Sequence, residues 1–291
     1  MRVLVTGAGG LLGSAITREF ARTADVAERG HGALDVSNEA AVFAALDEVR
    51  PDVVINCAAY NNVDAAEGNP VEALQVNAFG VLTLSRAASN HGAGLIHYST
   101  DFVFDGETGS PYTEDDRPNP RGVYAASKLL GDWFALEGVN AWVLRVESLF
   151  GMPPPGASRV GSLGTIVKGI QAGEEVPVFV DRTVSPSYTA DVARATRALL
   201  ELRPPPGLYH CVNSGAATWS RIAEEAAALL GLPLHIRPIT LESAGLKARR
   251  PRYCALSNAR LASIGIVMPP WQDALERHIR TLQIDPSRLK V

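Results

Sequence analysis

The stretch Arg2-Val3-Leu4-Val5-Thr6-Gly7-Ala8-Gly9-Gly10-Leu11-Leu12-Gly13 decides the fold. It begins with an apolar run rich in β-branched residues, which is typical of a short buried strand. Four glycines follow within seven positions, and a helix is predicted from about Leu11 to Arg22. A strand, a glycine-rich turn and a helix in this order form the first unit of a parallel α/β sheet.

Strands and helices alternate through the rest of the first half. Further strands are predicted at Asp25–Arg29, Val53–Asn56, Gly94–Tyr98 and Ala141–Val146, and helices at Asn38–Val49, Pro70–His91 and Gly122–Leu136. Strands that are apolar on both faces need helices on both sides of the sheet. The sequence therefore predicts an α/β fold with a Rossmann-like, doubly wound parallel sheet.

The second half has a different character, because Met152-Pro153-Pro154-Pro155-Gly156 interrupts the alternation. Beyond it we expect helices near 163–172, 189–202, 218–230 and 271–282, and strands near 176–180 and 208–212. The last strand is expected to rejoin the main sheet. We thus expect a dinucleotide-binding domain at 1–150, to which 183–215 returns, and a smaller C-terminal α/β substrate lobe at 151–182 and 216–291.

Composition excludes several classes of protein. The chain has 291 residues and a net charge of −4, without a block of like charge, so we expect no nucleic-acid partner. No apolar run reaches the ~20 residues of a membrane span, and the first residues lack the features of a signal peptide. Three widely spaced cysteines and no ligand-spaced histidines predict neither a disulfide framework nor a metal site. We expect a cytoplasmic protein.

The glycine loop is a candidate site for a dinucleotide. Gly7, Gly10 and Gly13 match the spacing G-x-x-G-x-x-G, with Leu11 and Leu12 between the last two. Glycines let the backbone turn tightly and approach a pyrophosphate, which rests on the helix N-terminus. A plain turn is the alternative, but the position directly after the first strand favours the phosphate site.

The kind of dinucleotide depends on the end of the second strand. Glu28 there favours NAD, whereas Arg29 favours the 2′-phosphate of NADP. We expect NADP(H) to be preferred and NAD(H) to be possible, with an exposed charge pair as the alternative for these two residues. Asp35 and Val36 are expected to close over the adenine.

Tyr124 and Lys128 stand four residues apart on one predicted helix, so they share a face. A phenol can donate a proton to a carbonyl oxygen, and a nearby ammonium lowers its pKa. Thr100 at the end of the fourth strand is expected to bond the same oxygen. Asn77 on the preceding helix is expected to hold a water behind Lys128. A half-buried tyrosine beside an unrelated solvated lysine is the alternative.

These motifs resemble the extended short-chain dehydrogenases/reductases, and more closely the dTDP-4-dehydrorhamnose reductase family. The matching stretches include Asn56-Cys57-Ala58-Ala59-Tyr60, Val63-Asp64-x-x-Glu67, Ser99-Thr100-Asp101-Phe102-Val103-Phe104-Asp105-Gly106, Tyr124-x-x-x-Lys128 and Ser185-Pro186-Ser187-Tyr188. The resemblance implies NAD(P)H-dependent reduction of the C4 ketone of a nucleotide-linked 4-keto-6-deoxy sugar, by a monomer or homodimer.

The resemblance also implies roles for single residues. The catalytic set would be Thr100, Tyr124 and Lys128. Cofactor contacts would add Cys57, Ala58, Ala59, Tyr60 and Ser99 to the loop, and substrate contacts would be Val63, Thr100, Asp101, Phe102, Ser148, Arg182 and Ser185. Lys247 and Arg252 are further candidates for contact with a diphosphate.

Two positions depart from the family pattern, which usually has Tyr at Phe102 and Trp at Ser148. The change at Ser148 removes an aromatic face for the sugar. A reductase of a different carbonyl substrate therefore stays open as an alternative. So does an NADP-binding regulatory subunit resembling that of methionine adenosyltransferase. A sugar-nucleotide dehydratase is disfavoured, because Phe102 stands where such enzymes need a carboxylate.

Overall fold

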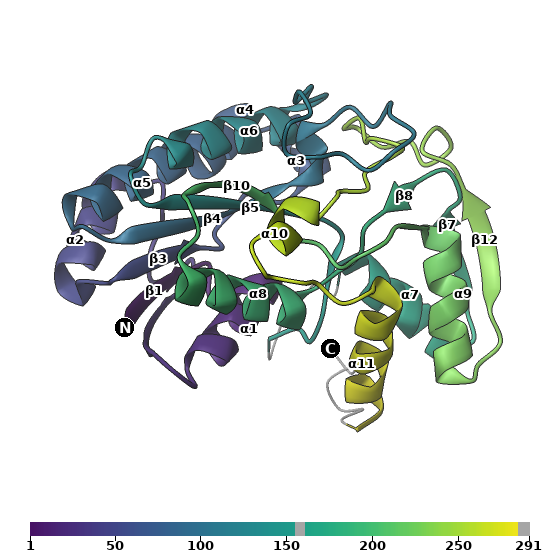
Figure 1. Cartoon of the computed structure of the whole chain (residues 1–291). Coiled ribbons are helices and arrows are strands. Elements are labelled where there is room, and N and C mark those ends of the chain that lie inside the picture. The colour runs from purple at the N-terminus through teal and green to yellow at the C-terminus, as the bar shows by residue number, and fades with distance from the viewer. Residues whose placement is uncertain (155–160, 285–291) are drawn as a thin grey trace.

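A six-stranded parallel sheet forms the centre of the computed structural model, which describes residues 1–154 and 161–284 (Figure 1). The strand order is β10-β5-β4-β3-β1-β2, and each neighbouring pair is parallel. The strands are β1 (Arg2–Thr6), β2 (Asp25–Arg29), β3 (Val53–Asn56), β4 (Gly94–Thr100), β5 (Ala141–Val146) and β10 (Gly207–His210). The predicted sheet is confirmed, including the return of β10.

Helices cover both faces of this sheet. Alternate residues of β1 face opposite cores: Val3 and Val5 pack with α1 (Leu11–Phe20) and α8 (Thr189–Leu202). Leu4 packs with the other group of helices, α2 (Glu39–Val49), α5 (Gly80–Asn90) and α6 (Val123–Leu136). In Figure 1, α1 and α8 lie below the sheet, α5 and α6 lie above it, and α2 lies at its left end. The carboxyl ends of the strands thus remain as the place for a ligand.

The helix predicted at Pro70–His91 is not one regular helix. It consists of α4 (Pro70–Leu74), a π-helical turn (Gln75–Phe79) and α5. Helix α6 packs directly on this turn, because a Cβ at Gly131 would lie 2.2 Å from the carbonyl oxygen of Asn77. Such π turns are common at functional sites, and this one holds Asn77 fully buried.

The second half forms a separate apolar core around β7 (Glu175–Phe179), α7 (Gly161–Ala172), α9 (Trp219–Leu230) and α11 (Trp271–Ile284). Strand β12 (His235–Ile239) pairs in parallel with β7. The sequence did not predict β12, since it is mostly exposed and contains a proline. Residues 155–156 of the predicted proline-rich break and residues 285–291 of the predicted lobe lie outside the described residues.

Short elements complete the connections between the two cores. They are α3 (Val63–Ala66), the 3-10 turn Asp101–Val103, α10 (Ala259–Ser263) and the two-residue strands β6 (Leu149–Phe150), β8 (Thr183–Val184), β9 (Ser187–Tyr188) and β11 (Ala217–Thr218). Leu261, Ile266 and Met268 pack in the core of the large sheet, although they come late in the chain.

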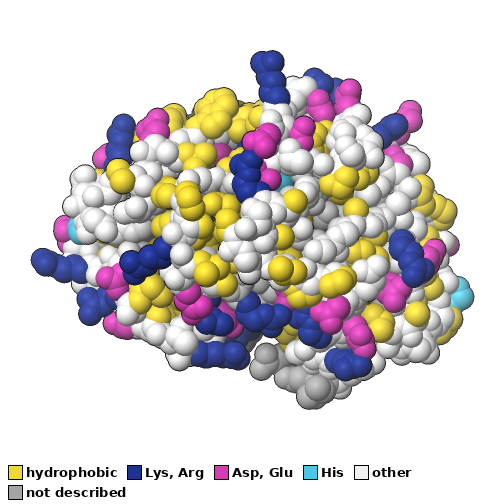
Figure 2. Space-filling model, in the orientation of Figure 1, with side chains coloured by type: hydrophobic (Ala, Val, Ile, Leu, Met, Phe, Trp, Pro, Cys, Tyr) yellow, Lys and Arg dark blue, Asp and Glu magenta, His cyan; other side chains and the backbone are white. Residues whose placement is uncertain are grey.

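Ion pairs join the last helix to the main sheet's helices. Arg277 of α11 donates to both carboxylate oxygens of Asp191 at 2.9 and 2.7 Å, and Asp191 lies in the first turn of α8. Figure 2 shows acidic and basic side chains interspersed over this face. Among the described helices, none is long and apolar enough to cross a membrane.

Candidate active site

The glycine loop is held by two close backbone contacts. Gly7 has φ +64°, and a Cβ there would lie 2.6 Å from the backbone nitrogen of Ala58. A Cβ at Gly13 would lie 2.2 Å from the carbonyl oxygen of Gly7, so α1 begins in contact with the loop. A Cβ at Gly9 would meet nothing within 4 Å. Gly7 and Gly13 therefore shape the loop, and the exposed Gly9 faces open space.

A cavity of about 620 Å³ adjoins this loop at the carboxyl ends of the strands. Most of the predicted cofactor residues line it, namely Gly10, Leu11, Leu12, Gly13, Cys57, Ala58, Ala59, Ser99, Tyr124 and Lys128. A tight loop that leaves no room for side chains, beside a cavity at a helix N-terminus, fits the pyrophosphate of a dinucleotide. The free thiol of Cys57 is only partly buried, whereas Cys211 and Cys254 are buried.

Other predicted cofactor residues have partners elsewhere. Arg29 donates to Glu48 Oε1 at 3.0 Å and to the carbonyl oxygen of Glu28 at 3.2 Å. Asp35 accepts from the backbone nitrogen and the hydroxyl of Ser37, which lowers the pKa of Asp35. Val36 is a core residue with 4% exposure. In this structure Arg29 is thus held by two protein oxygens.

A second cavity of about 640 Å³ lies on the outer side of the loop. Ala8, Gly9, Ser14, Arg18, Glu28 and Gly30 are among its lining residues. Arg18 is an exposed cation on α1 that the sequence analysis missed. Its position about two turns into α1 was the available signal, because helical side chains point back toward the helix N-terminus.

Asn77 fastens the chain that follows β3. Its Oδ1 accepts from the Tyr60 nitrogen at 2.9 Å, and its Nδ2 donates to the Tyr60 oxygen and to Ser127 Oγ, both at 3.0 Å. Both amide hydrogens are therefore used by protein atoms. That Asn77 holds a water behind Lys128 stays a prediction; in this structure the side chain joins Tyr60 to α6.

Tyr124 lines the cavity, and Thr100 lies close enough to act on it. Burial raises the pKa of Tyr124 above its ordinary value, and Thr100 opposes this rise. The role of Lys128 in lowering the tyrosine pKa stays a prediction, because Lys128 is not among the groups that act on Tyr124 in this structure. The reason is geometric: Lys128 Nζ lies 2.6 Å from the carbonyl oxygen of Tyr98 and 3.2 Å from His97 Nε2.

A buried hydrogen-bond chain crosses the sheet beneath Lys128. Asn56 Oδ1 accepts from Thr6 and from the Ala58 nitrogen, so its Nδ2 donates to His97 Nδ1 at 3.0 Å. A neutral His97 then carries its proton on Nε2, facing Lys128. Burial and Lys128 both hold the pKa of His97 well below its ordinary value.

Lys128 Nζ donates to the oxygen of Tyr98 and lies beside His97 Nε2. Burial lowers the pKa of Lys128 from 10.5 to about 8. Asp132 opposes this shift.

Asp132 and Arg145 form a buried ion pair behind the site at 3.1 Å. Their exposures are 1% and 2%, and the guanidinium of Arg145 also lies over the Phe104 ring. The sequence analysis missed this pair. Asp132 follows Lys128 by four residues on α6, so helical spacing was a usable signal.

The predicted substrate residues lie at different depths. Phe102 packs edge-on against the Tyr124 ring at 5.7 Å, and the guanidinium of Arg182 lies over Phe102 at the same distance. Ser148 is partly buried, with φ +42° between β5 and β6. Ser185 is fully buried and its hydroxyl accepts from the Leu256 nitrogen.

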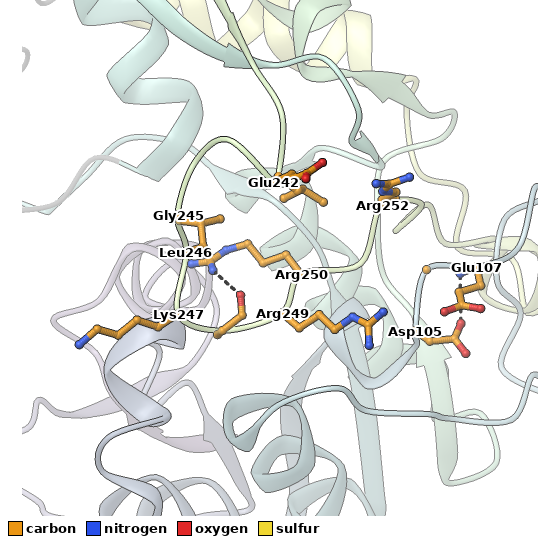
Figure 3. A pocket seen from close by; sticks show the side chains of 12 residues that line it. Asp105, Glu107, Glu242, Gly245, Leu246, Lys247, Arg249, Arg250 and Arg252 are labelled. Atoms are coloured by element: carbon orange, nitrogen blue, oxygen red, sulfur yellow. Dashed lines mark hydrogen bonds between the residues drawn. The ribbon is translucent and has the colours of Figure 1, made fainter.

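A basic loop of the smaller lobe lines a further cavity of about 830 Å³ together with residues 105–107 (Figure 3). The loop residues that line it are 241, 242, 245–250 and 252. Arg249 extends toward Asp105 and Glu107, while Lys247 points away from them. Arg250 bonds both carboxylate oxygens of Asp64, at 2.9 and 2.7 Å, which fixes this loop to α3 beside Val63.

The parallel sheet, the glycine loop and the paired Tyr124 and Lys128 define the chain as an extended short-chain dehydrogenase/reductase. The model of the family described as RmlD substrate binding domain matches residues 1–284. The chain belongs to this family.

Relatives agree with this assignment. A dTDP-4-dehydrorhamnose reductase of Streptomyces griseus is 38% identical, over 94% of this chain and 91% of that protein. A probable dTDP-4,6-dihydroxy-2-methyloxan-3-one 4-ketoreductase of Streptomyces antibioticus is 37% identical, over 94% and 93%. The structure of a dTDP-4-dehydrorhamnose reductase of Bacillus anthracis in complex with NADP is 31% identical, with a TM-score of 0.90 over 96% and 99% of the two chains.

Proposed function

We propose that the protein is an NAD(P)H-dependent reductase that transfers hydride to the C4 ketone of a nucleotide-linked 4-keto-6-deoxy sugar. The observation that carries the proposal is the cavity at the carboxyl ends of the strands, where Tyr124 and Lys128 lie beside the glycine loop. The named relatives that reduce dTDP-linked keto sugars support it. We extend the proposal to NADP(H) as the preferred cofactor, with NAD(H) possible.

The bound dinucleotide would supply the hydride. Gly10 to Gly13 would hold its pyrophosphate, and Lys128 would hold the nicotinamide ribose. Thr100 would bond the substrate carbonyl oxygen, and Tyr124 would give that oxygen its proton. The edge-on ring of Phe102 limits the rotation of Tyr124, and so orients its hydroxyl.

The two cores suggest how the parts share the work. Residues 1–150 with 183–215 would hold the dinucleotide, and residues 151–182 and 216–291 would hold the sugar nucleotide. Arg249 and Arg252, exposed beside the cavity of Figure 3, are suitable partners for a diphosphate. We propose that the enzyme acts in the cytoplasm as a monomer or homodimer.

A related keto sugar is the second candidate substrate. Ser148 offers no aromatic face to a sugar, and one named relative reduces a different dTDP-linked ketone. The fold and the proposed hydride chemistry would be the same for both substrates, so only a substrate panel separates them.

The experiment is the oxidation of NADPH or NADH, followed by absorbance, with dTDP-4-dehydro-L-rhamnose and with other dTDP-linked 4-keto sugars. Tyr124→Phe removes the proton donor, and we expect it to lower kcat by ~10²-fold or more. NADPH affinity, measured by calorimetry, is expected to stay within a few-fold.

Two outcomes would contradict this function. Full activity of Tyr124→Phe would remove the tyrosine from the chemistry. Tight NADPH binding without turnover of any keto sugar would favour the regulatory-subunit alternative, which co-purification with a synthetase would then test.

A further inference from the structure

A buried cluster of charged side chains lies behind Thr100. Asp101 follows β4, Glu147 follows β5, Arg182 follows β7, and Cys254 lies in the segment before α10. Their exposures are 3%, 2%, 8% and 0%. A ligating atom from each of Asp101, Glu147 and Cys254 lies within 4.8 Å of the other two. Three separate parts of the chain therefore bring two carboxyl groups together away from water.

The charges in this cluster do not balance. Arg182 is the single cation, and it uses Nη2 on Cys254 Sγ at 3.1 Å and Nε on the oxygen of Pro251 at 3.2 Å. Asp101 Oδ2 and Glu147 Oε1 are buried and have no hydrogen-bond partner in the described part of the chain. Two ionised carboxylates beside one guanidinium would leave a net negative charge in an apolar site. A single proton shared by the two carboxyl groups removes it.

The cluster is connected to the proposed proton donor. Thr100 Oγ1 donates to Asp101 Oδ1 at 3.0 Å, and the same side chain lies close enough to Tyr124 to act on its pKa. Thr100 Oγ1 also accepts from the Phe102 nitrogen at 3.3 Å. A hydroxyl has one proton to donate, so Thr100 can donate to Asp101 or to Tyr124, but not to both.

The direction of the chain depends on Asp101. An ionised Asp101 takes the Thr100 proton, and Tyr124 then donates to Thr100, away from a substrate. A protonated Asp101 donates to Thr100, Thr100 donates to Tyr124, and the phenol proton is free to face a carbonyl oxygen.

We propose that Asp101 and Glu147 share one proton, and that this proton directs the Asp101–Thr100–Tyr124 hydrogen-bond chain toward the substrate carbonyl. Glu147 is thus a positioning residue: when Glu147 is ionised, its charge places the single proton of the pair on Asp101. The inference rests on the proposed reductase function and adds to it a source for the proton.

The proton step balances. A bound dinucleotide would supply the hydride of the new C–H bond, and the carbonyl oxygen would take the proton of Tyr124. The tyrosinate takes the proton of Thr100, and Thr100 takes the proton of Asp101. The carboxyl pair, now without its proton, is reprotonated from water after product release.

Some surroundings of the pair raise the pKa values of Asp101 and Glu147, and others lower them. Burial raises the pKa of Asp101 to about 6, whereas Arg182, Thr100 and Cys254 oppose the rise. Burial and Asp101 raise the pKa of Glu147 well above its ordinary value, against the Ser185 nitrogen and Arg182.

Two tyrosines also face the pair. Glu147 raises the pKa of Tyr253, and Asp101 contributes to the raised pKa of Tyr124. The thiol of Cys254 stays neutral, because burial raises its pKa well above the ordinary value.

Glu147→Gln tests the inference through the pH profile of kcat. The amide keeps the volume and can still accept from the Ser185 nitrogen, which lies 2.6 Å from Glu147 Oε2. Asp101 then faces Arg182 without a second carboxylate, so its pKa falls. We expect the alkaline limb of kcat to move to lower pH by about one unit or more.

Two further variants make the profile specific. Glu114→Gln is the matched control, since Glu114 is 3% exposed in its side chain and accepts from the His210 nitrogen at 2.8 Å; its limb should stay in place. Asp101→Asn cannot ionise, and its amide can donate to Thr100 at every pH, so its alkaline limb should vanish. Circular dichroism and NADPH affinity report whether each variant is folded.

Infrared spectroscopy of the dinucleotide-free protein tests the shared proton without any substrate. At neutral pH we expect a protonated-carboxyl C=O band in the wild type that Glu147→Gln loses and Glu114→Gln keeps. Absence of this band, or turnover whose limb does not move in Glu147→Gln, would overturn the inference. A band without turnover of any keto sugar would refute the proposed function and the proton relay, and leave the shared proton established.

Discussion

Gly13→Ala tests how closely the glycine loop is shaped for a phosphate group. A Cβ at this position would lie 2.2 Å from the oxygen of Gly7 and 2.9 Å from the Cα of Ala8. Both contacts are with backbone, so no side chain can move away to relieve them. Helix α1 or the loop must therefore shift.

The size of the effect follows from the cost of overpacking. Inserting a methyl group into a closely packed site costs ~1–3 kcal/mol. If the loop relaxes in the free protein, the clash returns only when the loop adopts the geometry that binds the dinucleotide. The cost then lowers the binding free energy, which corresponds to about a 5- to 150-fold higher Kd.

The other glycines of the loop provide a graded control. A Cβ at Gly10 would lie 3.3 Å from the oxygen of Gly7, and a Cβ at Gly9 would meet nothing within 4 Å. Calorimetric titration with NADPH should therefore rank the Kd values Gly13→Ala above Gly10→Ala above Gly9→Ala. Urea unfolding of each free variant separates lost affinity from lost stability.

The order of the three Kd values is the test of this contact. Equal affinities for Gly13→Ala and Gly9→Ala, with both proteins folded, would mean that the backbone contact between Gly7 and Gly13 does not shape the binding loop. The assignment of this loop to the pyrophosphate would then lose its structural basis.

Two further predictions concern buried charges near the site. Lys128 has a pKa of about 8 in the folded protein and 10.5 ordinarily, so between these pH values the unfolded state binds more protons. The free energy of unfolding should therefore rise with pH, by up to ~1.4 kcal/mol per unit, and Lys128→Met should lack this rise. If urea unfolding gives the same difference between wild type and variant at pH 7 and at pH 9, the prediction is refuted. Arg145→Met leaves Asp132 buried without its guanidinium and should lower the free energy of unfolding by ~3–5 kcal/mol, whereas the double variant with Asp132→Asn should regain much of the loss; no recovery would show that packing of Arg145, not the unpaired charge, stabilises the fold.

Local pattern was sufficient for the fold class and for part of the site. Apolar strands at regular spacing and the glycine loop after β1 determine a parallel sheet, because only helices on both faces can bury such strands. The same pattern places Thr100 at the carboxyl end of β4 and Tyr124 four residues before Lys128. Their closeness follows from the topology of the sheet.

Side-chain partnerships were decided only in three dimensions. The pKa of Tyr124 could not be predicted from its spacing to Lys128, since it depends on burial, Thr100 and Asp101. The lysine is bonded to Tyr98 and lies beside His97. Arg29 has the right position for a 2′-phosphate, but its contact with Glu48 on α2 depends on how that helix packs.

Glu147 shows the same limit most clearly. In the sequence, Glu147 is a charged residue directly after a strand, and such residues are mostly exposed. The fold instead buries it beside Asp101, Arg182 and Cys254, residues that lie 35 or more positions away along the chain. The sequence by itself determined the sheet, the loop and the order of the proposed catalytic groups, because those depend on local periodicity and topology. The tertiary structure alone decided which buried charges meet, because that depends on packing between distant segments.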